Sequence, residues 1–127
     1  MKIYGIGVDI VNTNRFKKMS KNNKIIYRLF NQTEISKCKK LPNKENCYAK
    51  KFAAKEAFSK AIGTGISNGI NFNEIVITNN KLGKPYIILM GNTKKVIKKS
   101  LNNKKFDIFL SLSDEKKFAI AMVIVTI

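Results

Sequence analysis

The segment FAAKEAFSKAIG, residues 52–63, constrains the fold more than any other stretch of the chain. If it is a helix, at about 100° per residue, small and apolar side chains occupy one half of its surface: Ala53, Ala54, Ala57, Phe58, Ala61 and Ile62. The other half carries Phe52, Lys55, Glu56, Ser59 and Lys60. Alanines allow the helix axis to lie close to its neighbour, and Gly63 can adopt the left-handed conformation that ends a helix. We therefore expect a helix held against the core, with Glu56 and Lys60 on its free side.

Glu56 and Lys60 lie one helical turn apart. An ordinary ion pair at this spacing contributes about 0.2–0.5 kcal/mol and has no function. A catalytic or ligand-binding role is the other interpretation. The segment by itself leaves both interpretations open.

The 127 residues predict a single domain, residues 1–127, with a formal net charge of +17. Such a charge suits a negatively charged partner: nucleic acid, an anionic membrane, a phosphorylated ligand or an acidic protein. Nearly all of the charge is lysine, and asparagine is equally over-used. A biased genome composition produces this pattern without selection for binding. The net charge therefore does not choose among these partners.

Several classes of site are excluded by what the sequence lacks. The longest apolar run, residues 118–125, is too short to cross a bilayer, and residues 1–11 do not resemble a secretory signal. We expect a cytoplasmic protein without membrane association, and the sequence leaves open whether a targeting segment preceded Met1. The chain has no histidine, which removes the usual zinc sites and histidine acid-base chemistry. Cys38 and Cys47, its two cysteines, are expected to be reduced and structural.

The N-terminal strand, expected over Ile3–Val11, has one nearly bare face. Gly5, Gly7 and Asp9 alternate along that face, and bulkier side chains occupy the other. Glycines at alternate strand positions indicate that a helix or a ligand approaches closely. Asp9 then stands where that close approach ends. The simpler alternative is that Asp9 only terminates the strand before a turn.

Three short helices are expected before the central one: one to Met19 capped by Asn12 or Thr13, one over residues 24–30, and one from a cap at Thr33 to Leu41. Residues 43–46 are expected to be a polar connection. The first two helices form a basic amphipathic arm that contains Arg15. Positive charge beside apolar residues suits an acidic protein helix, although a solvated surface is the default interpretation.

The C-terminal half is expected to be rich in strands. After a turn at residues 67–69, a hairpin pairs strands 72–78 and 86–90, a helix covers residues 93–101, and a second hairpin pairs strands 106–113 and 118–127. The run Phe118–Val125 is apolar on both faces. Both faces are therefore expected to be buried, one of them by a subunit interface.

Three separate segments then indicate one site. Asp9 ends the glycine-faced strand, Glu56 lies on the free side of the central helix, and Ser111–Asp114 ends a strand. Protein-bound Mg²⁺ usually takes one or two carboxylates and keeps positions for water and substrate phosphate. The set therefore suggests a magnesium and phosphate site, although the spacing does not establish that the three segments meet.

Four motifs in this order resemble one known family: IYGIGVDIV at residues 3–11, FAAKEAFSKA with GTGI at residues 52–66, GKP at residues 83–85, and LSLS followed by AIA at residues 110–121. The chain closely resembles the holo-[acyl-carrier-protein] synthase family of small bacterial-type 4'-phosphopantetheinyl transferases. The resemblance implies an α+β fold in which an antiparallel sheet packs with a long central helix. It also implies a homotrimer with active sites at the subunit interfaces.

The reaction implied by the resemblance moves 4'-phosphopantetheine from coenzyme A to a serine of apo-acyl carrier protein, in fatty acid biosynthesis, and releases adenosine 3',5'-bisphosphate. Asp9 and Glu56 would bind Mg²⁺ and act with Lys60 in catalysis, and Glu56 or a metal-held water would assist loss of the serine proton. Arg15 would meet the acidic carrier protein. The residues expected beside coenzyme A are Lys51, Lys55, Lys60, Ser113 and Asp114.

Two positions depart from the family pattern. Asp114 stands where the family usually has a histidine near the phosphates, and Lys51 stands where arginine is common. An aspartate repels phosphate unless a lysine or a metal compensates, and lysine lacks bidentate phosphate binding. Two alternatives follow: a coenzyme A-binding relative without turnover, and a basic nucleic-acid-binding module. The second lacks a groove-reading motif or an aromatic platform, so no nucleic-acid partner is expected.

Overall fold

Strand β1 (Ile3–Asn12) and helix α4 (Lys44–Ile62) form the centre of the fold in the computed structural model, which describes residues 1–63 and 69–127. Gly5 and Gly7 lie directly against the backbone of α4. A Cβ atom on either glycine would overlap the carbonyl oxygen of Ala61 or Ala57. The close approach predicted for the bare face of the strand is therefore confirmed, and a helix makes it.

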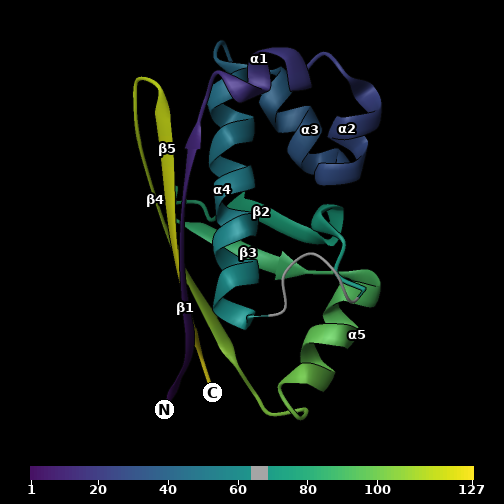
Figure 1. Cartoon of the computed structure of the whole chain (residues 1–127), viewed down its shortest axis with the longest axis vertical. Helices are drawn as coiled ribbons and strands as arrows, with labels where there is room; N and C mark the ends of the chain where they lie inside the picture. Colours follow the sequence, from purple (N-terminus) through teal and green to yellow (C-terminus); the bar gives the residue numbers. More distant parts are fainter. Residues whose placement is uncertain (64–68) are drawn as a thin grey trace.

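The main sheet has three antiparallel strands in the order β1-β5-β4, with β4 spanning Asp107–Glu115 and β5 spanning Phe118–Thr126. Helix α4 covers its inner face, where the small side chains Ala119 and Ala121 of β5 are fully buried. Figure 1 shows the helices on one side of this sheet and no element of the chain on the other. The predicted α+β class with a long central helix is confirmed.

A second, two-stranded sheet pairs β2 (Ile75–Asn79) with β3 (Pro85–Leu89) and confirms the predicted hairpin. A short 3-10 helix, η1 (Phe72–Glu74), occupies the first part of the stretch expected to be strand. Helix α5 (Gly91–Ser100) follows β3. The turn expected at residues 67–69 falls largely outside the described residues.

The arm contains α1 (Arg15–Met19) and α2 (Asn23–Leu29), and α3 (Gln32–Lys39) leads from it to α4. Several predicted helix starts were wrong. Asn31, not Thr33, caps α3, and Asn14 precedes α1 without a capping hydrogen bond from its side chain. Residues 44–46 belong to α4, because the Asn43 side chain accepts a hydrogen bond from the Asn46 amide and caps the helix there.

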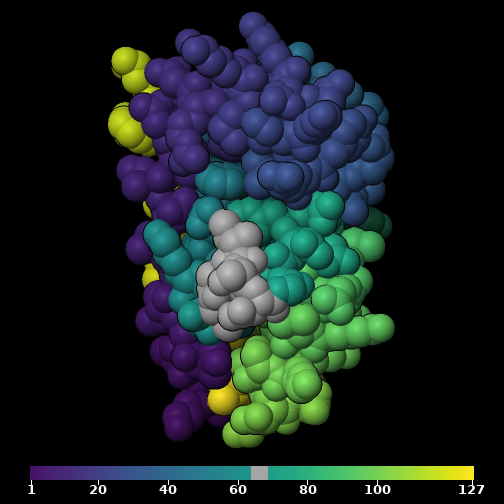
Figure 2. Space-filling view, turned by 45° about the vertical axis from the view of Figure 1, so that its right-hand side comes forward, coloured from purple at the N-terminus to yellow at the C-terminus, as the bar shows by residue number. Residues whose placement is uncertain are grey.

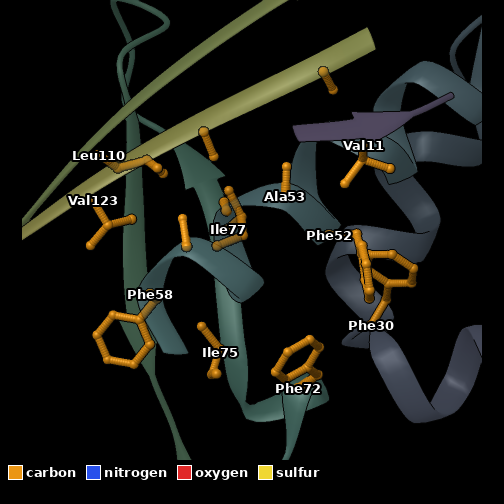
Figure 3. Packing of buried hydrophobic residues seen from close by; sticks show 14 of the residues in the cluster. Val11, Phe30, Phe52, Ala53, Phe58, Phe72, Ile75, Ile77, Leu110 and Val123 are labelled. Carbon is orange, nitrogen blue, oxygen red and sulfur yellow. The ribbon is translucent and has the colours of Figure 1, made fainter. Parts of the chain in front are cut away.

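Helix α4 is buried on more sides than its sequence predicts. Figure 3 shows Phe52 of α4 among the buried hydrophobic residues, and the Phe52 ring centroid lies 5.6 Å from that of Phe16 and 5.9 Å from that of Phe72. Phe52, Lys55 and Ser59 were assigned to the free side of the helix, and all three are buried. The main sheet covers one flank of α4, and the arm, α3 and β2 cover another. Little of the surface of α4 is therefore exposed to solvent.

Cys38 and Cys47 form a disulfide bond, so the expectation of two reduced thiols was wrong. The end of α3 and the first turn of α4 run side by side, which brings the two Cα atoms to 5.5 Å. Nothing in the sequence spacing indicates this proximity.

Different helices form the two ends of the molecule. Figure 2 shows the arm and α3, in blue, forming one end of the surface and α5, in green, forming the other. Gly63 has a φ of +86° and ends α4 in the left-handed conformation, as predicted. No helix within residues 1–63 and 69–127 is long and apolar enough to cross a membrane.

Candidate active site and phosphate cavity

Asp9 of β1 and Lys60 of α4 meet at the junction of strand and helix. The Lys60 ammonium lies 3.1 Å from Asp9 Oδ1 and donates a 3.0 Å hydrogen bond to the Val8 carbonyl. Lys60 therefore joins the helix to the strand. The simple interpretation, in which Lys60 pairs with Glu56 along the helix, does not describe this contact.

Glu56 lies in the same place and is half-buried. Burial raises the pKa of its carboxyl group, and the negative charge of Asp9 raises it further, while Lys60 and Arg15 act in the opposite direction. The structure thus brings Asp9, Glu56 and Lys60 together, as the sequence predicted. A half-buried carboxyl group whose ionisation is disfavoured by a neighbouring carboxylate forms a site that a cation would stabilise.

The donor set fits a hydrated Mg²⁺ ion. Mg²⁺ commonly binds through one or two carboxylates and completes its shell with water and phosphate oxygens. Among residues 1–63 and 69–127, no group of three or more His, Cys, Asp or Glu side chains could hold a metal ion. Asp9 and Glu56 would therefore supply two positions and leave the remainder to water and substrate.

Arg15 borders this site from α1. Its guanidinium lies over the Phe52 ring, 5.4 Å from the centroid, and its charge lowers the pKa of Glu56. Arg15 thus connects the basic arm to the carboxylates.

A separate cavity of about 430 Å³ lies between α3, α4, β2 and β3. Lys37, Lys50 and Lys51 line it together with Gly83 and Pro85. We call it the lysine cavity. It contains Lys51, which was predicted to lie beside coenzyme A. Lys37 and Lys50 were not singled out from the sequence, because single lysines are inconspicuous in a chain so rich in lysine.

The lysines of this cavity have fixed positions. Lys51 donates a 2.9 Å hydrogen bond to the Ile77 carbonyl, and Lys37 donates one of 2.7 Å to Asn79 Oδ1. Burial lowers the pKa of Lys51 to about 8, the charges of Lys37 and Lys50 lower it too, and Glu34 opposes the shift. One buried ammonium group, Lys51, and two more exposed ones that disfavour its charge form a site that an anion would stabilise.

The negative charge of Asp114 is compensated by a lysine, Lys50, as the departure from the family pattern at this position would require. Its carboxylate accepts a 3.0 Å hydrogen bond from Asn46 Nδ2 and one of 3.3 Å from Lys50 Nζ. The Asn46 hydrogen bond is the largest cause of the lowered pKa of Asp114, and the Lys50 charge adds to it. The neighbouring Ser113 is exposed.

Lys55 is fully buried, so its predicted place on the free side of α4 was wrong. Its ammonium lies 2.7 Å from each of three acceptors: Glu34 Oε1 and the carbonyl oxygens of Phe72 and Ile75. These contacts use all three of its protons, and none is left for a phosphate. The physical reason is the edge of β2, whose carbonyl groups have no neighbouring strand and are satisfied by lysines of α4.

The two clusters lie on opposite flanks of α4. Lys51 and Lys60 are nine positions apart, which places them about half a turn out of phase, and they contact β2 and β1 respectively. Asp9 and Asp114 likewise lie on the two edge strands of the main sheet. Within one chain, the carboxylates and the lysine cavity therefore do not face each other.

The outer face of the main sheet is apolar and uncovered in the single chain. Its large side chains are each between 40% and 60% exposed: Tyr4, Ile6, Val8, Ile10, Phe109, Phe118, Ile120 and Met122. One face of β5 is thus buried under α4, while the face assigned to a subunit interface is open. A contiguous apolar surface of this kind marks an interaction site.

Comparison with known proteins gives consistent results. The model of the 4'-phosphopantetheinyl transferase superfamily matches residues 5–123. The holo-[acyl-carrier-protein] synthase of Pelagibacter ubique is 52% identical over 98% of this chain and 97% of its own length. The chain is also similar to two solved structures. The holo-[acyl-carrier-protein] synthase of Neisseria meningitidis has a TM-score of 0.87 at 34% identity and 98% coverage of both chains. The Bacillus anthracis enzyme, solved in complex with CoA (3',5'-ADP), has a TM-score of 0.80 at 35% identity, covering 98% of this chain and 97% of that one.

Proposed function

The chain belongs to the 4'-phosphopantetheinyl transferase superfamily, and from this we propose that it transfers the 4'-phosphopantetheine group of coenzyme A to a serine of apo-acyl carrier protein. The serine oxygen forms a bond to the phosphorus that carries pantetheine. The bond from that phosphorus to the bridging oxygen breaks, and adenosine 3',5'-bisphosphate leaves. The single observation that carries this proposal is the meeting of Asp9, Glu56 and Lys60 at the β1–α4 junction.

Asp9 and Glu56 would hold Mg²⁺ in this site. When bound, Mg²⁺ supplies positive charge to the pyrophosphate oxygens and helps to align them. Lys60, fixed by Val8 and Asp9, directs its ammonium group at the same region and stabilises negative charge that develops on the phosphate. Glu56, with its raised pKa, accepts the serine proton directly or through a water molecule.

The lysine cavity suits the phosphorylated adenosine end of coenzyme A. Lys51 and Lys50 offer ammonium groups there, and the cavity volume of about 430 Å³ admits a nucleotide-sized group. Asp114 lies behind Lys50 and does not line this cavity. Its compensation by Lys50 favours an active transferase over a relative that binds coenzyme A without turnover.

We further propose that the active site is shared between subunits of a homotrimer. The carboxylates and the lysine cavity face apart within one chain, so one coenzyme A molecule can contact both when they come from neighbouring copies. The apolar outer face of the main sheet provides the surface for that association. Arg15 and the basic arm then remain available to an acidic carrier protein.

A cytoplasmic location is part of this proposal, with one observation to reconcile. Disulfides such as Cys38–Cys47 are uncommon in reducing compartments. The proposal is therefore that this bond is protected in the cell by its burial, since the Cys38 side chain is fully buried.

The transfer reaction is tested by incubating apo-acyl carrier protein with coenzyme A, Mg²⁺ and the chain, and measuring the intact mass of the carrier protein. We expect the mass to increase by one phosphopantetheine group. Asp9→Asn and Glu56→Gln should each lower the rate roughly 10²–10³-fold. Asp107→Asn, which changes an exposed carboxylate of the same sheet, is the matched control and should keep the rate.

Full activity of either site variant would remove that carboxylate from the proposed mechanism. Salt-sensitive binding of RNA or DNA, without coenzyme A binding or mass increase, would favour the nucleic-acid alternative.

A further inference from the structure

A buried carboxylate, Glu34 of α3, lies behind the lysine cavity and has no part in the reaction described above. Its side chain is fully enclosed, and the residue is 2% exposed. Oε1 accepts hydrogen bonds from the Asn31 amide at 2.9 Å and from Lys55 Nζ at 2.7 Å, and Oε2 accepts one from the Ile77 amide at 3.0 Å. A buried charge with this many partners is expensive to remove singly.

Glu34 and Lys51 hold the two polar backbone atoms of the same residue. The Ile77 amide donates to Glu34, and the Ile77 carbonyl accepts from Lys51. Both atoms lie on the edge of β2 that has no neighbouring strand. The position of this edge, and with it the anchor of the Lys51 ammonium at the cavity wall, therefore depends on Glu34.

Glu34 also compensates the positive charge around Lys51. Facing Lys51 are Glu34 and Lys37 from α3, and Lys50 and Lys55 from α4, while β2 contributes the Ile77 carbonyl. Asp114 of β4 is engaged with Lys50 and Asn46. Burial is the main cause of the lowered pKa of Lys51, the charges of Lys37 and Lys50 lower this pKa further, and the Glu34 carboxylate opposes the shift.

We propose that Glu34 is a positioning residue that acts through Lys51: it fixes the Lys51 ammonium at the wall of the lysine cavity and keeps it a cation for a phosphate of coenzyme A. This inference rests on the proposed function. It assigns to the α3 carboxylate an indirect role in ligand binding, since Glu34 is buried and does not line the lysine cavity.

The test is the pH dependence of coenzyme A binding, measured by isothermal titration calorimetry from about pH 6 to pH 10 at fixed Mg²⁺ concentration. In the wild-type chain, affinity should fall as the pH rises through about 8, where Lys51 loses its proton. Glu34→Gln removes the compensating charge, so the fall should move to lower pH by about one unit. Lys51→Arg keeps its charge throughout, so the fall should disappear. In the double variant Glu34→Gln/Lys51→Arg, the loss of Glu34 should no longer shift the profile.

A purely structural role of the Glu34–Lys55 pair is distinguished by Lys55→Met. This variant breaks the same pair but keeps the Glu34 carboxylate that compensates Lys51, so the pH at which affinity falls should not move to lower values as it does in Glu34→Gln. Shifts in the same direction for both variants, or none for Glu34→Gln, would overturn the inference. If Glu34→Gln does not fold, Lys51→Arg and Lys55→Met still test the inference. A decrease of coenzyme A affinity with rising pH that persists in Lys51→Arg refutes it. A wild-type chain that binds no coenzyme A at any pH contradicts the proposed function instead.

Discussion

Glu56 occupies a position that lowers the stability of the folded chain and that serves the reaction in the proposed mechanism. Its carboxyl group is half-buried beside Asp9, and both burial and the Asp9 charge raise its pKa above the value in the unfolded chain. The folded state therefore binds this proton more tightly than the unfolded state does. The resulting stabilisation is present at low pH and is lost as the pH rises through the pKa of Glu56 in the folded chain.

Glu56→Gln should therefore be more stable than the wild-type chain at pH 7 while losing transfer activity. The difference in melting temperature should shrink as the pH falls through the titration range of Glu56, because the wild-type carboxyl group is then neutral as well. The measurement is thermal unfolding over a pH series with a chelator present, since a metal ion would offset the repulsion between the two carboxylates. A variant that is less stable than wild type at pH 7 would contradict this account of the site.

Single residues differ in how far the sequence predicts their surroundings. Asp9, Glu56 and Lys60 were singled out because a carboxylate at the end of a glycine-faced strand and charges on an alanine-rich helix are local signals. Only the family resemblance implied that the three residues act in one site. Lys55 has the same kind of local signal and is buried. Its partners, Glu34 and two carbonyl groups of the segment 72–75, are distant in sequence, so the helical pattern around Lys55 does not contain them.

At the scale of elements, the packing of β1 against α4 positions the site. Gly7 has no side chain, so the backbone of α4 approaches the strand closely. This approach lets Lys60 reach both Asp9 and the Val8 carbonyl. Gly7 lies two residues before Asp9. The distance between the Asp9 and Glu56 carboxylates therefore depends on the absence of a side chain at position 7.

Gly7→Ala should destabilise the chain by about 3 kcal/mol or more, because the new methyl group overlaps the Ala57 carbonyl and the Ala61 amide of α4. The measurement is urea unfolding followed by circular dichroism. Gly83→Ala is the matched comparison: Gly83 has a φ of +89° and open surroundings, so its substitution should cost only about 1 kcal/mol for the backbone conformation. Equal costs for the two variants would show that the contact between β1 and α4 is not tight.

Elements were predicted better than their ends. Hydrophobic periodicity indicated β1, the two hairpins and α5, but asparagines before α3 and α4 begin these helices at points where polar residues also suggest loops. The burial of Lys51 and Lys55 is also explained by the packing of elements. Strand β2 has an edge without a neighbouring strand, and Lys51 and Lys55 of α4 satisfy its carbonyl groups.

For the whole molecule, the exposed outer face of the main sheet is the surface through which we propose that the subunits associate. Met122→Lys places a charge in the middle of this face on β5 and should prevent trimer formation, because a buried, unpaired ammonium is costly. Size-exclusion chromatography with light scattering measures the mass, and transfer activity should fall with it. Leu82→Lys is the control, since Leu82 is 95% exposed in the β2–β3 turn and its change should leave both unaffected.

The proposed sharing of the active site between subunits predicts that two inactive variants can restore activity together. Asp9→Asn disables the carboxylate cluster and Lys51→Met disables the lysine cavity, so each variant alone should be inactive. After mixed refolding, some interfaces would contain an intact carboxylate cluster from one chain and an intact cavity from another, and activity should return. Failure of the mixture to recover activity, with trimers present, would place both clusters of a working site in one chain.

The sequence by itself determined the α+β class, the bare face of a glycine-faced strand and the small-residue face of an alanine-rich helix, with one carboxylate on each element. These features depend on residues that are neighbours along one strand or one helix. The tertiary structure decided which charges are buried, that Cys38 joins Cys47, and that Lys37, Lys50 and Lys51 surround one cavity with Glu34 behind it. These features bring together side chains from separate elements, and the energy of a charge depends on which neighbours surround it once the chain has folded.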